Sequence, residues 1–218
     1  MRPEIKFCGM TRAEDIRAAV DLGARYVGVV FAGGPRTLGV EEAHELLAGV
    51  PAGVGRVGVF GRDLEPGVVG EIAGRCRLDV VQLHGDPALR DVAAVRTHFA
   101  GIVWAALRVR GVELPRGAAE LFRSADAVVV DAYSPASLGG TGVALPWGAL
   151  AASLGAARAG GRLVLAGGLR PDTVGEAVRA LRPDVVDVSS GVESAPGIKD
   201  RAKLRAFRDA LDDQVARA

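Results

Sequence analysis

The fold is decided by a repeating unit whose clearest copy is VVQLHGDPALRDVAAVRTHFAGIVWAAL, residues 80–107. The first residues, 80–84, form a short run rich in Val and Leu, as is typical of a buried strand. A turn containing glycine and proline follows, and apolar residues then recur at helical spacing over 87–98. A second apolar run occupies 102–107. This order predicts two parallel strands joined by a crossover helix.

The same unit recurs along the whole chain, and its apolar runs are nearly continuous, as expected for parallel strands covered on both faces. Strands are predicted over 5–8, 26–31, 56–60, 80–84, 102–107, 127–133, 162–167 and 185–190. Helices are predicted over 12–22, 40–49, 65–76, 87–98, 115–124, 147–158, 172–181 and 199–211.

Two architectures accommodate alternating strands and helices, an open doubly wound sheet and a closed barrel. Eight units within 218 residues, with no linker or change of composition between them, favour a (β/α)8 TIM barrel that forms one domain over residues 1–218. The open sheet stays as the alternative, because periodicity does not report closure. In a barrel, the catalytic residues lie at the carboxyl ends of the strands and in the loops that follow.

Composition excludes several classes of function. The chain is 49% hydrophobic and 24% charged with a net charge of +1, which gives no electrostatic case for binding nucleic acid. No apolar stretch approaches the ~18 residues that a membrane span needs, and the N-terminal residues carry charges that a signal peptide lacks. Two distant cysteines, Cys8 and Cys76, and three unpaired histidines predict neither a disulfide nor a metal site. We expect a cytoplasmic protein.

Glycine-bearing loops follow the last three predicted strands. Glycine lets backbone N–H groups close on an anion, and barrels often bind phosphate with the loops after the seventh and eighth strands. The alternative is that these glycines only form tight turns, but three such loops at one rim favour phosphate binding. The predicted phosphate-binding residues are Gly139, Gly140, Gly142, Gly167, Gly168, Ser190 and Gly191.

Five side chains are candidates at the same rim. Cys8 ends the first strand, as a reactive thiol or as a small buried residue. Arg36 follows the second strand and is either an ordinary surface arginine or, as its position favours, a clamp for a planar carboxylate. His84 ends the fourth strand, where it could hydrogen-bond a substrate or a neighbouring side chain. Asp131, near the end of the sixth, is either a loop-capping residue or a general acid with a raised pKa. Asp187 lies further inside its strand, which favours a structural carboxylate.

Together these motifs resemble the phosphoribosylanthranilate isomerase family of tryptophan biosynthesis. The matching segments run in the family's order from residue 5 to about 200, and KFCG, VQLHG and VDVSSGVE are the most specific of them. They are KFCGMTRAED (6–15), GPR (34–36), VGVF (57–60), VQLHG (81–85), DAY (131–133), GGTG (139–142), LAGGLRPDTV (165–174) and VDVSSGVESAPGIKD (186–200).

The resemblance implies a ribulose-phosphate-binding barrel that needs no metal or organic cofactor. It implies an Amadori rearrangement of N-(5-phosphoribosyl)anthranilate to 1-(2-carboxyphenylamino)-1-deoxyribulose 5-phosphate. Cys8 would be the general base, Asp131 the general acid and Arg36 the residue facing the anthranilate carboxylate, with His84 and Asp187 as further substrate-binding residues. A thiol base must be partly ionised, so we expect neighbouring N–H groups or positive charge to lower the pKa of Cys8.

The chain departs from the family's pattern in two places. Gly34 stands where the family commonly has serine, and Leu145-Pro146 stands where it has Phe-Asp, which removes a carboxylate at the start of a predicted helix. Both changes are expected to affect the ordering of loops or the affinity for a ligand more than the chemical step, since Cys8, Arg36 and Asp131 are present.

Two other functions compete with this interpretation. The isomerase of histidine biosynthesis, or a dual-substrate version of it, performs the same rearrangement on a larger bis-phosphate. That pattern has aspartate in place of Cys8, and only one phosphate cradle is evident in this chain. The third possibility is a non-catalytic phosphate-binding barrel, against which the presence of both Cys8 and Asp131 argues. The expected partner is a small phosphosugar, bound by a monomer or a homodimer.

Overall fold

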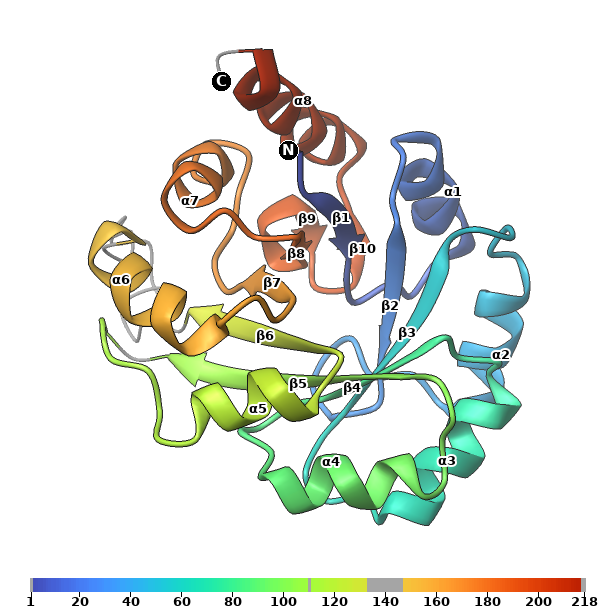
Figure 1. The fold of residues 1–218 in the computed structure, drawn as a ribbon. Coiled ribbons are helices and arrows are strands. Elements are labelled where there is room, and N and C mark those ends of the chain that lie inside the picture. Colours follow the sequence, from blue (N-terminus) through green and yellow to red (C-terminus); the bar gives the residue numbers. More distant parts are fainter. Residues whose placement is uncertain (1, 110, 133–146, 217–218) are drawn as a thin grey trace.

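The computed structural model describes residues 2–109, 111–132 and 147–216, and these form a closed barrel of eight parallel strands surrounded by helices (Figure 1). The strands are β1 (Glu4–Phe7), β2 (Tyr26–Val30), β3 (Gly55–Phe60), β4 (Val80–Leu83), β5 (Ile102–Val109), β6 (Ala127–Ala132), β7 (Leu163–Ala166) and β8 (Val185–Val188). The helices are α1 (Ala13–Asp21), α2 (Val40–Ala48), α3 (Pro66–Arg75), α4 (Leu89–Arg96), α5 (Ala118–Ser124), α6 (Trp147–Arg158), α7 (Val174–Leu181) and α8 (Arg201–Ala216).

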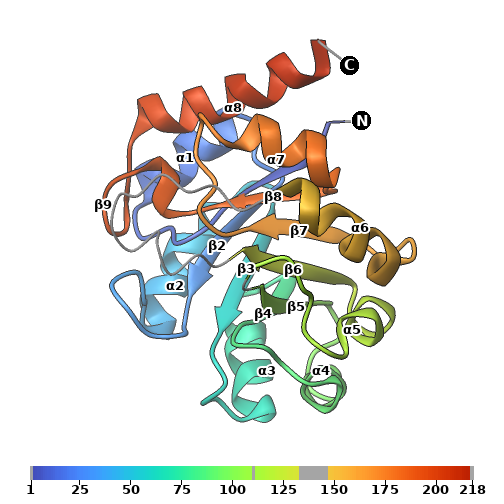
Figure 2. The same ribbon diagram turned by 90° about the vertical axis from the view of Figure 1, so that its left-hand side faces the viewer.

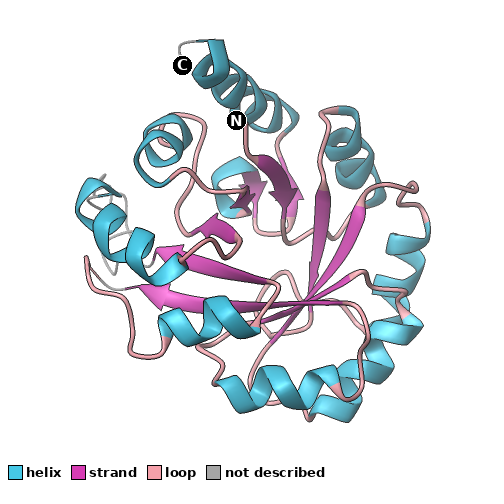
Figure 3. Cartoon of the chain, in the orientation of Figure 1, coloured by secondary structure: helices cyan, strands magenta, loops and turns pink. Residues whose placement is uncertain are grey.

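Closure of the sheet confirms the predicted barrel over the open alternative. The first strand pairs with the last in parallel, with Ile5 opposite Val186 and Lys6 opposite Asp187. Helices cover the outside of the strands in both views of the chain (Figures 2 and 3). Among the described residues, no helix combines the length and apolar character needed to cross a bilayer.

The helices begin where the sequence supplies partners for free backbone N–H groups. The amide of Gly39 donates to the Glu42 carboxylate at 2.8 Å, and the amide of Ala88 donates to the Asp91 carboxylate at the same distance. Each acidic residue sits three positions inside its helix, as in one half of a capping box. Pro66 opens α3 at a position where its missing N–H costs no hydrogen bond.

The largest departure from the predicted elements follows β8. The strand ends at Val188 because Ser189 leaves the extended region, with φ −125° and ψ −87°, and Ser190–Val192 forms the single 3-10 turn η2. An unpredicted antiparallel hairpin of β9 (Glu193–Ala195) and β10 (Ile198–Lys199) comes next. Helix α8 therefore begins at Arg201, two residues later than expected, and continues to Ala216.

Side chains at alternate strand positions fill the barrel interior. Lower in the lumen they are apolar, with Tyr26 packed edge-on against the fully buried Trp104 at 5.0 Å between ring centroids. The outward-facing positions pack against the helices, as Phe7 of β1 does against Phe207 of α8. Because successive side chains of a strand face opposite sides, the residues at the carboxyl ends that continue the inward series point into the mouth of the barrel.

A buried ion pair between Lys6 and Asp187 lies within the lumen. Lys6 Nζ donates to Asp187 Oδ2 at 2.7 Å, and the two side chains are 0% and 7% exposed. Burial alone would lower the pKa of Lys6, but Asp187 and the neighbouring Cys8 outweigh it, so the pKa lies above its ordinary value and the ammonium stays charged. The pair joins the first and last strands of the barrel.

Replacing Lys6 by methionine is expected to lower the free energy of unfolding by ~3–5 kcal/mol, because it leaves the Asp187 carboxylate buried without a counter-charge. Urea denaturation at pH 7 measures the change. Arg90→Met, which removes a surface arginine 3.8 Å from Asp91, is the matched control and should cost less than ~1 kcal/mol. A Lys6→Met protein as stable as the control would show that the lumen pair contributes no net stability.

Candidate active site

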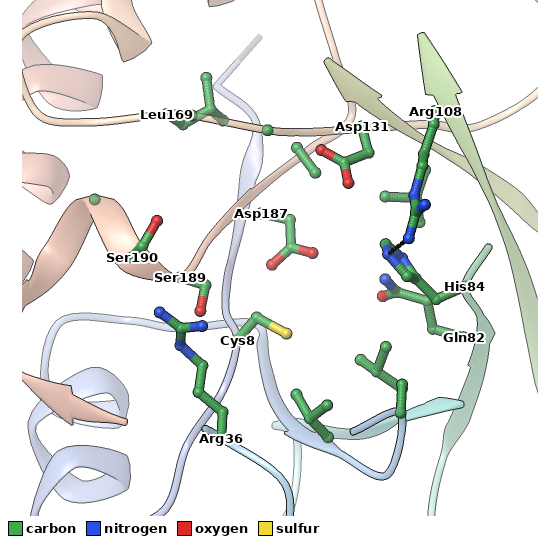
Figure 4. Close-up of a pocket in the computed structure, with 18 of the residues that line it drawn as sticks. Cys8, Arg36, Gln82, His84, Arg108, Asp131, Leu169, Asp187, Ser189 and Ser190 are labelled. Carbon is green, nitrogen blue, oxygen red and sulfur yellow. Dashed lines mark hydrogen bonds between the residues drawn. The ribbon is translucent and has the colours of Figure 1, made fainter. Parts of the chain in front are cut away.

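A cavity of about 470 Å³ opens at the carboxyl ends of the barrel strands. Its walls combine residues from the strand ends with residues from the loops after β2, β7 and β8 (Figure 4). The polar and charged residues that line it are Cys8, Arg36, Gln82, His84, Arg108, Asp131, Asp187, Ser189 and Ser190. The five predicted side chains, Cys8, Arg36, His84, Asp131 and Asp187, therefore all reach one cavity.

Cys8 follows β1 directly, and its amide donates to the Val188 carbonyl at 2.9 Å. The thiol lies over Gly28 of β2, where an added Cβ would come within 3.1 Å of both Cys8 Sγ and Lys6 Cε. The glycine thus leaves the space that the thiol and the lysine stem occupy. Cys8 is half-buried and faces the cavity (Figure 4).

The expectation of a lowered thiol pKa at Cys8 is wrong for the unliganded protein. Burial raises the pKa of Cys8 above its ordinary value of 9.0, and the Asp187 carboxylate acts in the same direction. Positive charge on Lys6 and Lys199 opposes the shift without reversing it. Sequence reasoning expected a positive charge near the thiol but could not determine how deeply the sulfur is buried, and burial decides the direction of the pKa shift.

Asp131 lies at the end of β6, opposite Arg108 of β5 in the strand register. Burial raises the pKa of Asp131 above its ordinary value, with Asp187 adding to the rise, while His84 and Arg108 counteract it in part. The direction is that of a carboxyl group able to hold a proton and deliver it to a ligand.

His84 and Arg108 stand side by side on the wall next to Asp131. Arg108 Nη2 lies 3.3 Å from His84 Nε2, and because a guanidinium only donates, Nε2 accepts and the neutral ring carries its proton on Nδ1. Burial lowers the pKa of His84, which favours this uncharged form. Sequence reasoning missed Arg108, since the fifth strand was predicted to end at 107; counting one inward position further would have found it.

Two buried acceptors in the cavity lack a hydrogen-bond partner among the described residues. They are Gln82 Oε1, from β4, and Asp187 Oδ1, the oxygen that Lys6 leaves free. Buried acceptors without a partner carry a desolvation cost that a ligand's hydroxyl or N–H would relieve. Asp187 therefore holds Lys6 with one oxygen and has its other oxygen without a partner among the described residues.

Arg36 reaches the cavity from the loop after β2, and its guanidinium is already engaged. Nε and Nη2 donate to the two carboxylate oxygens of Glu193 at 2.8 and 2.6 Å. Glu193 belongs to the unpredicted hairpin and was missed, although it lies in the ESAPGIKD segment of the sequence. Gly34, two residues earlier, has φ +94°, a conformation that favours glycine over the serine commonly found there.

Loops after β7 and β8 form one rim of the cavity and contain four of the predicted phosphate-binding residues, Gly167, Gly168, Ser190 and Gly191. The two loops touch, since a Cβ on Gly191 would lie 1.9 Å from the Leu169 carbonyl oxygen. The other three predicted glycines, Gly139, Gly140 and Gly142, lie outside the described residues, as do Leu145 and Pro146. Within the described part of the chain, no group of three or more His, Cys, Asp or Glu side chains could hold a metal ion.

Comparison with known proteins gives one consistent result. The model of the N-(5′-phosphoribosyl)anthranilate isomerase family matches residues 5–210. The N-(5′-phosphoribosyl)anthranilate isomerase of Geobacter sulfurreducens is 44% identical over 204 residues, which cover 93% of this chain and 95% of the relative.

Two solved structures extend the comparison to three dimensions. Phosphoribosylanthranilate isomerase in complex with reduced 1-(o-carboxyphenylamino)-1-deoxyribulose 5-phosphate superposes with a TM-score of 0.83 at 30% identity, covering 97% of this chain and 99% of that one. Monomers generated from the dimeric enzyme of Thermotoga maritima give a TM-score of 0.80 at 31% identity, covering 97% and 99%.

Proposed function

Because the chain belongs to the N-(5′-phosphoribosyl)anthranilate isomerase family, we propose that its cavity carries out the Amadori rearrangement of N-(5-phosphoribosyl)anthranilate to 1-(2-carboxyphenylamino)-1-deoxyribulose 5-phosphate. The chain is an isomerase of tryptophan biosynthesis that interconverts an aldose and a ketose. The observation that supports the mechanism best is that Cys8 and Asp131, from β1 and β6, face one cavity with Asp187 between them (Figure 4).

The rearrangement needs one acid and one base. Protonated Asp131 gives its proton to the furanose ring oxygen, the C1–O bond breaks, and the nitrogen lone pair forms an iminium at C1. The Cys8 thiolate then removes the proton from C2, and those electrons neutralise the iminium to give an enolamine. Tautomerisation of the enolamine to the ketone completes the product. Each positioned proton-transfer group typically contributes ~10²–10⁴ in rate.

Other lining residues bind and orient the substrate in this proposal. Arg36 receives the anthranilate carboxylate, and the free oxygens of Asp187 and Gln82 accept hydrogen bonds from the sugar hydroxyls or the amine. His84, neutral with its proton on Nδ1, donates to the substrate next to Asp131. The rim of Gly167, Gly168, Ser190 and Gly191 cradles the phosphate with backbone N–H groups. Gly139, Gly140 and Gly142 complete the cradle in the same proposal.

Substituting Gly191 by alanine is expected to raise KM about tenfold or more, because even a small displacement of a binding loop is costly. The added Cβ would lie 1.9 Å from the Leu169 carbonyl oxygen, so the loops after β7 and β8 must separate. Steady-state kinetics and competition by inorganic phosphate measure the effect. Gly148→Ala, in α6 with open space around the added methyl group, is the control. An unchanged KM and phosphate inhibition in Gly191→Ala would remove this rim from phosphate binding.

The pH profile of kcat/KM tests the assignment of acid and base. The reactive form holds protonated Asp131 and ionised Cys8, although the pKa of Cys8 is raised above 9.0 and that of Asp131 above 3.8. Below the pKa of Asp131 the rate rises with pH, because the thiolate fraction grows. Between the two pKa values the opposing changes cancel and the profile is flat. Above the pKa of Cys8 the rate falls as protonated Asp131 disappears. A falling limb that begins well below 9.0 would contradict the assignment.

One assay separates the proposal from its rivals. Purified protein is mixed with freshly generated phosphoribosylanthranilate, without added metal, and loss of the anthranilate-type fluorescence is followed. Turnover supports the proposal. Conversion of the histidine-pathway aminoaldose alone would favour the sister isomerase. The sequence pattern of that enzyme, however, has aspartate at the position of Cys8. Binding of the phosphosugar without turnover of either compound would favour a non-catalytic barrel.

We further propose that residues 1–218 act as one domain in the cytoplasm, as a monomer or a homodimer. The support for either state is the relative from Thermotoga maritima, which is described as dimeric and from which monomers were generated. Light scattering on the purified protein, read at several concentrations, distinguishes the two states.

A further inference from the structure

Arg36 is held between the backbone at Gly9, which follows β1, and the carboxylate of Glu193 in the hairpin after β8. We propose that Glu193 is a positioning residue for Arg36, and that Lys199 supplies the buried counter-charge that lets Glu193 act. The inference rests on the proposed role of Arg36 as receptor of the anthranilate carboxylate. The inference explains how Arg36 is positioned for that role. An ion-paired cluster of Arg36, Glu193 and Lys199, the last two from the hairpin after β8, fixes the guanidinium before a ligand binds.

The first observation is the geometry of the pair. Glu193, whose side chain is 5% exposed, receives two parallel hydrogen bonds from Nε and Nη2 of Arg36. A bidentate arginine–carboxylate pair fixes the plane of the guanidinium as well as its position. Neither bond uses Nη1, and Arg36 lines the cavity, so the group keeps donors for a ligand (Figure 4).

The second observation lies on the other side of the arginine. The aliphatic stem of Arg36 crosses Gly9 so closely that an added Cβ would come within 2.5 Å of Arg36 Cδ and 2.9 Å of Ser189 Oγ. Gly9 also has φ +70°, which disfavours other residues. The arginine is thus confined between the backbone after β1 and the carboxylate of the hairpin. This confinement limits the rotamers of a side chain that otherwise loses much entropy on binding.

The third observation is the position of Lys199. Its Nζ donates to Glu193 Oε1 at 2.7 Å and to the Cys8 carbonyl at 2.6 Å, and the side chain is 0% exposed. Burial alone would raise the pKa of Glu193, but hydrogen bonds from Arg36 and Lys199 outweigh it and hold the pKa below its ordinary value. The carboxylate is therefore ionised. Lys199 also ties the cluster to the backbone of Cys8.

The net charge of the cluster sets its electrostatic attraction for a ligand. Arg36 and Lys199 are positive and Glu193 is negative, so the cluster keeps one net positive charge for an incoming carboxylate. If Glu193 only reduced the net positive charge, removing the Glu193 carboxylate would strengthen carboxylate binding. If Glu193 positions Arg36, removing it weakens carboxylate binding even though the positive charge increases. The two roles thus predict opposite signs.

The test compares two ligands that differ only in the carboxylate. The probes are reduced 1-(2-carboxyphenylamino)-1-deoxyribulose 5-phosphate and its phenylamino analogue without the carboxyl group, with affinities measured by calorimetry. Wild-type protein is expected to prefer the carboxylated probe by about tenfold or more, as for a charge-assisted bidentate contact. In Glu193→Gln this preference should fall to about threefold or less, while the affinity for the phenylamino probe stays within about twofold.

A charge-matched variant covers the case in which Glu193→Gln fails to fold with Lys199 unpaired. Glu193→Gln/Lys199→Met restores the single positive charge of the cluster and should lose the same preference. Lys203→Met is the control, because the Lys203 ammonium donates to the backbone carbonyl of Glu193 and not to its carboxylate, and it should keep the preference.

Three results would overturn the inference. They are a preference that rises in Glu193→Gln, a preference that is kept in the charge-matched variant, and an equal loss of affinity for both probes, which marks a general structural role. A fourth result, a wild-type protein that turns over its substrate yet binds both probes equally, would overturn the role of Arg36 and with it this inference, while the proposed reaction stands. Absence of turnover is the separate result that contradicts the proposed function.

Discussion

Replacing Cys8 by serine is expected to lower kcat by about 10²–10⁴-fold, the usual contribution of a general base. Serine has nearly the same shape, so it fits over Gly28 and keeps the backbone contact with Val188. Its hydroxyl, however, ionises far less readily than a thiol, and the burial that already raises the pKa of Cys8 would oppose an alkoxide even more strongly. KM should change little, because Arg36 and the glycine rim, and not Cys8, are the proposed receptors of the substrate's carboxylate and phosphate.

The second cysteine supplies the matched control. Cys76 is 2% exposed, outside the cavity, with its thiol directed at the Val40 carbonyl. Cys76→Ser should keep wild-type kcat, since no reacting atom comes near it. Steady-state kinetics at pH 8 with both variants separates loss of the base from the general effect of removing a thiol. A Cys8→Ser enzyme with near-wild-type kcat would exclude Cys8 as the base.

Asp131→Asn is expected to lower kcat by at least about 10²-fold, because asparagine preserves the size of the side chain but has no proton to give to the ring oxygen. The pH dependence of its residual kcat/KM should also change. Without a titrating acid, kcat/KM no longer levels off above the Asp131 pKa but rises with pH until the pKa of Cys8. A variant that keeps the flat region of the wild-type profile would show that another group is the acid.

Stability measurements distinguish loss of the catalytic acid in Asp131→Asn from loss of the folded structure. The pKa of Asp131 is raised in the folded protein, so its protonated form favours folding at low pH and this contribution is lost as the pH rises through the folded pKa. An ionised carboxylate is unfavourable in this buried site, whereas an amide carries no charge that burial would penalise. Asp131→Asn should therefore be at least as stable as wild type at pH 7, and lost activity then reflects lost chemistry.

The sequence predicts the barrel and much of its mouth for one physical reason. The carboxyl ends of the strands of a parallel barrel meet at one rim, so Cys8, His84 and Asp131 could be placed together without coordinates. Period-two alternation, counted one inward position back from His84 and one inward position past Ala106, would also have found Gln82 and Arg108. The prediction depended on strand ends, which are the least certain part of any pattern.

The remainder of the site depends on features that patterns do not encode. Arg36 and Glu193 are 157 positions apart, and the hairpin that carries Glu193 consists of strands too short to show alternation. Lys199 was assigned to the start of a helix, which hid its contact with the backbone of Cys8. The direction of the Cys8 pKa shift depends on how deep the sulfur lies, and that depth follows from how the loops cover it.

The pairing of β1 with β8 determines when, during synthesis, the chain can become active. Cys8 is translated among the first residues, yet its amide partner Val188, the lumen carboxylate Asp187 and the lysine that holds its carbonyl, Lys199, are translated near the end. A nascent chain that has emerged only through β7 carries the thiol without the strand that completes its surroundings. Contacts of such long sequence separation form late and slowly. With Cys8 as the proposed base, we expect catalysis to begin only after the hairpin that follows β8 has left the ribosome, and incomplete chains to be inactive.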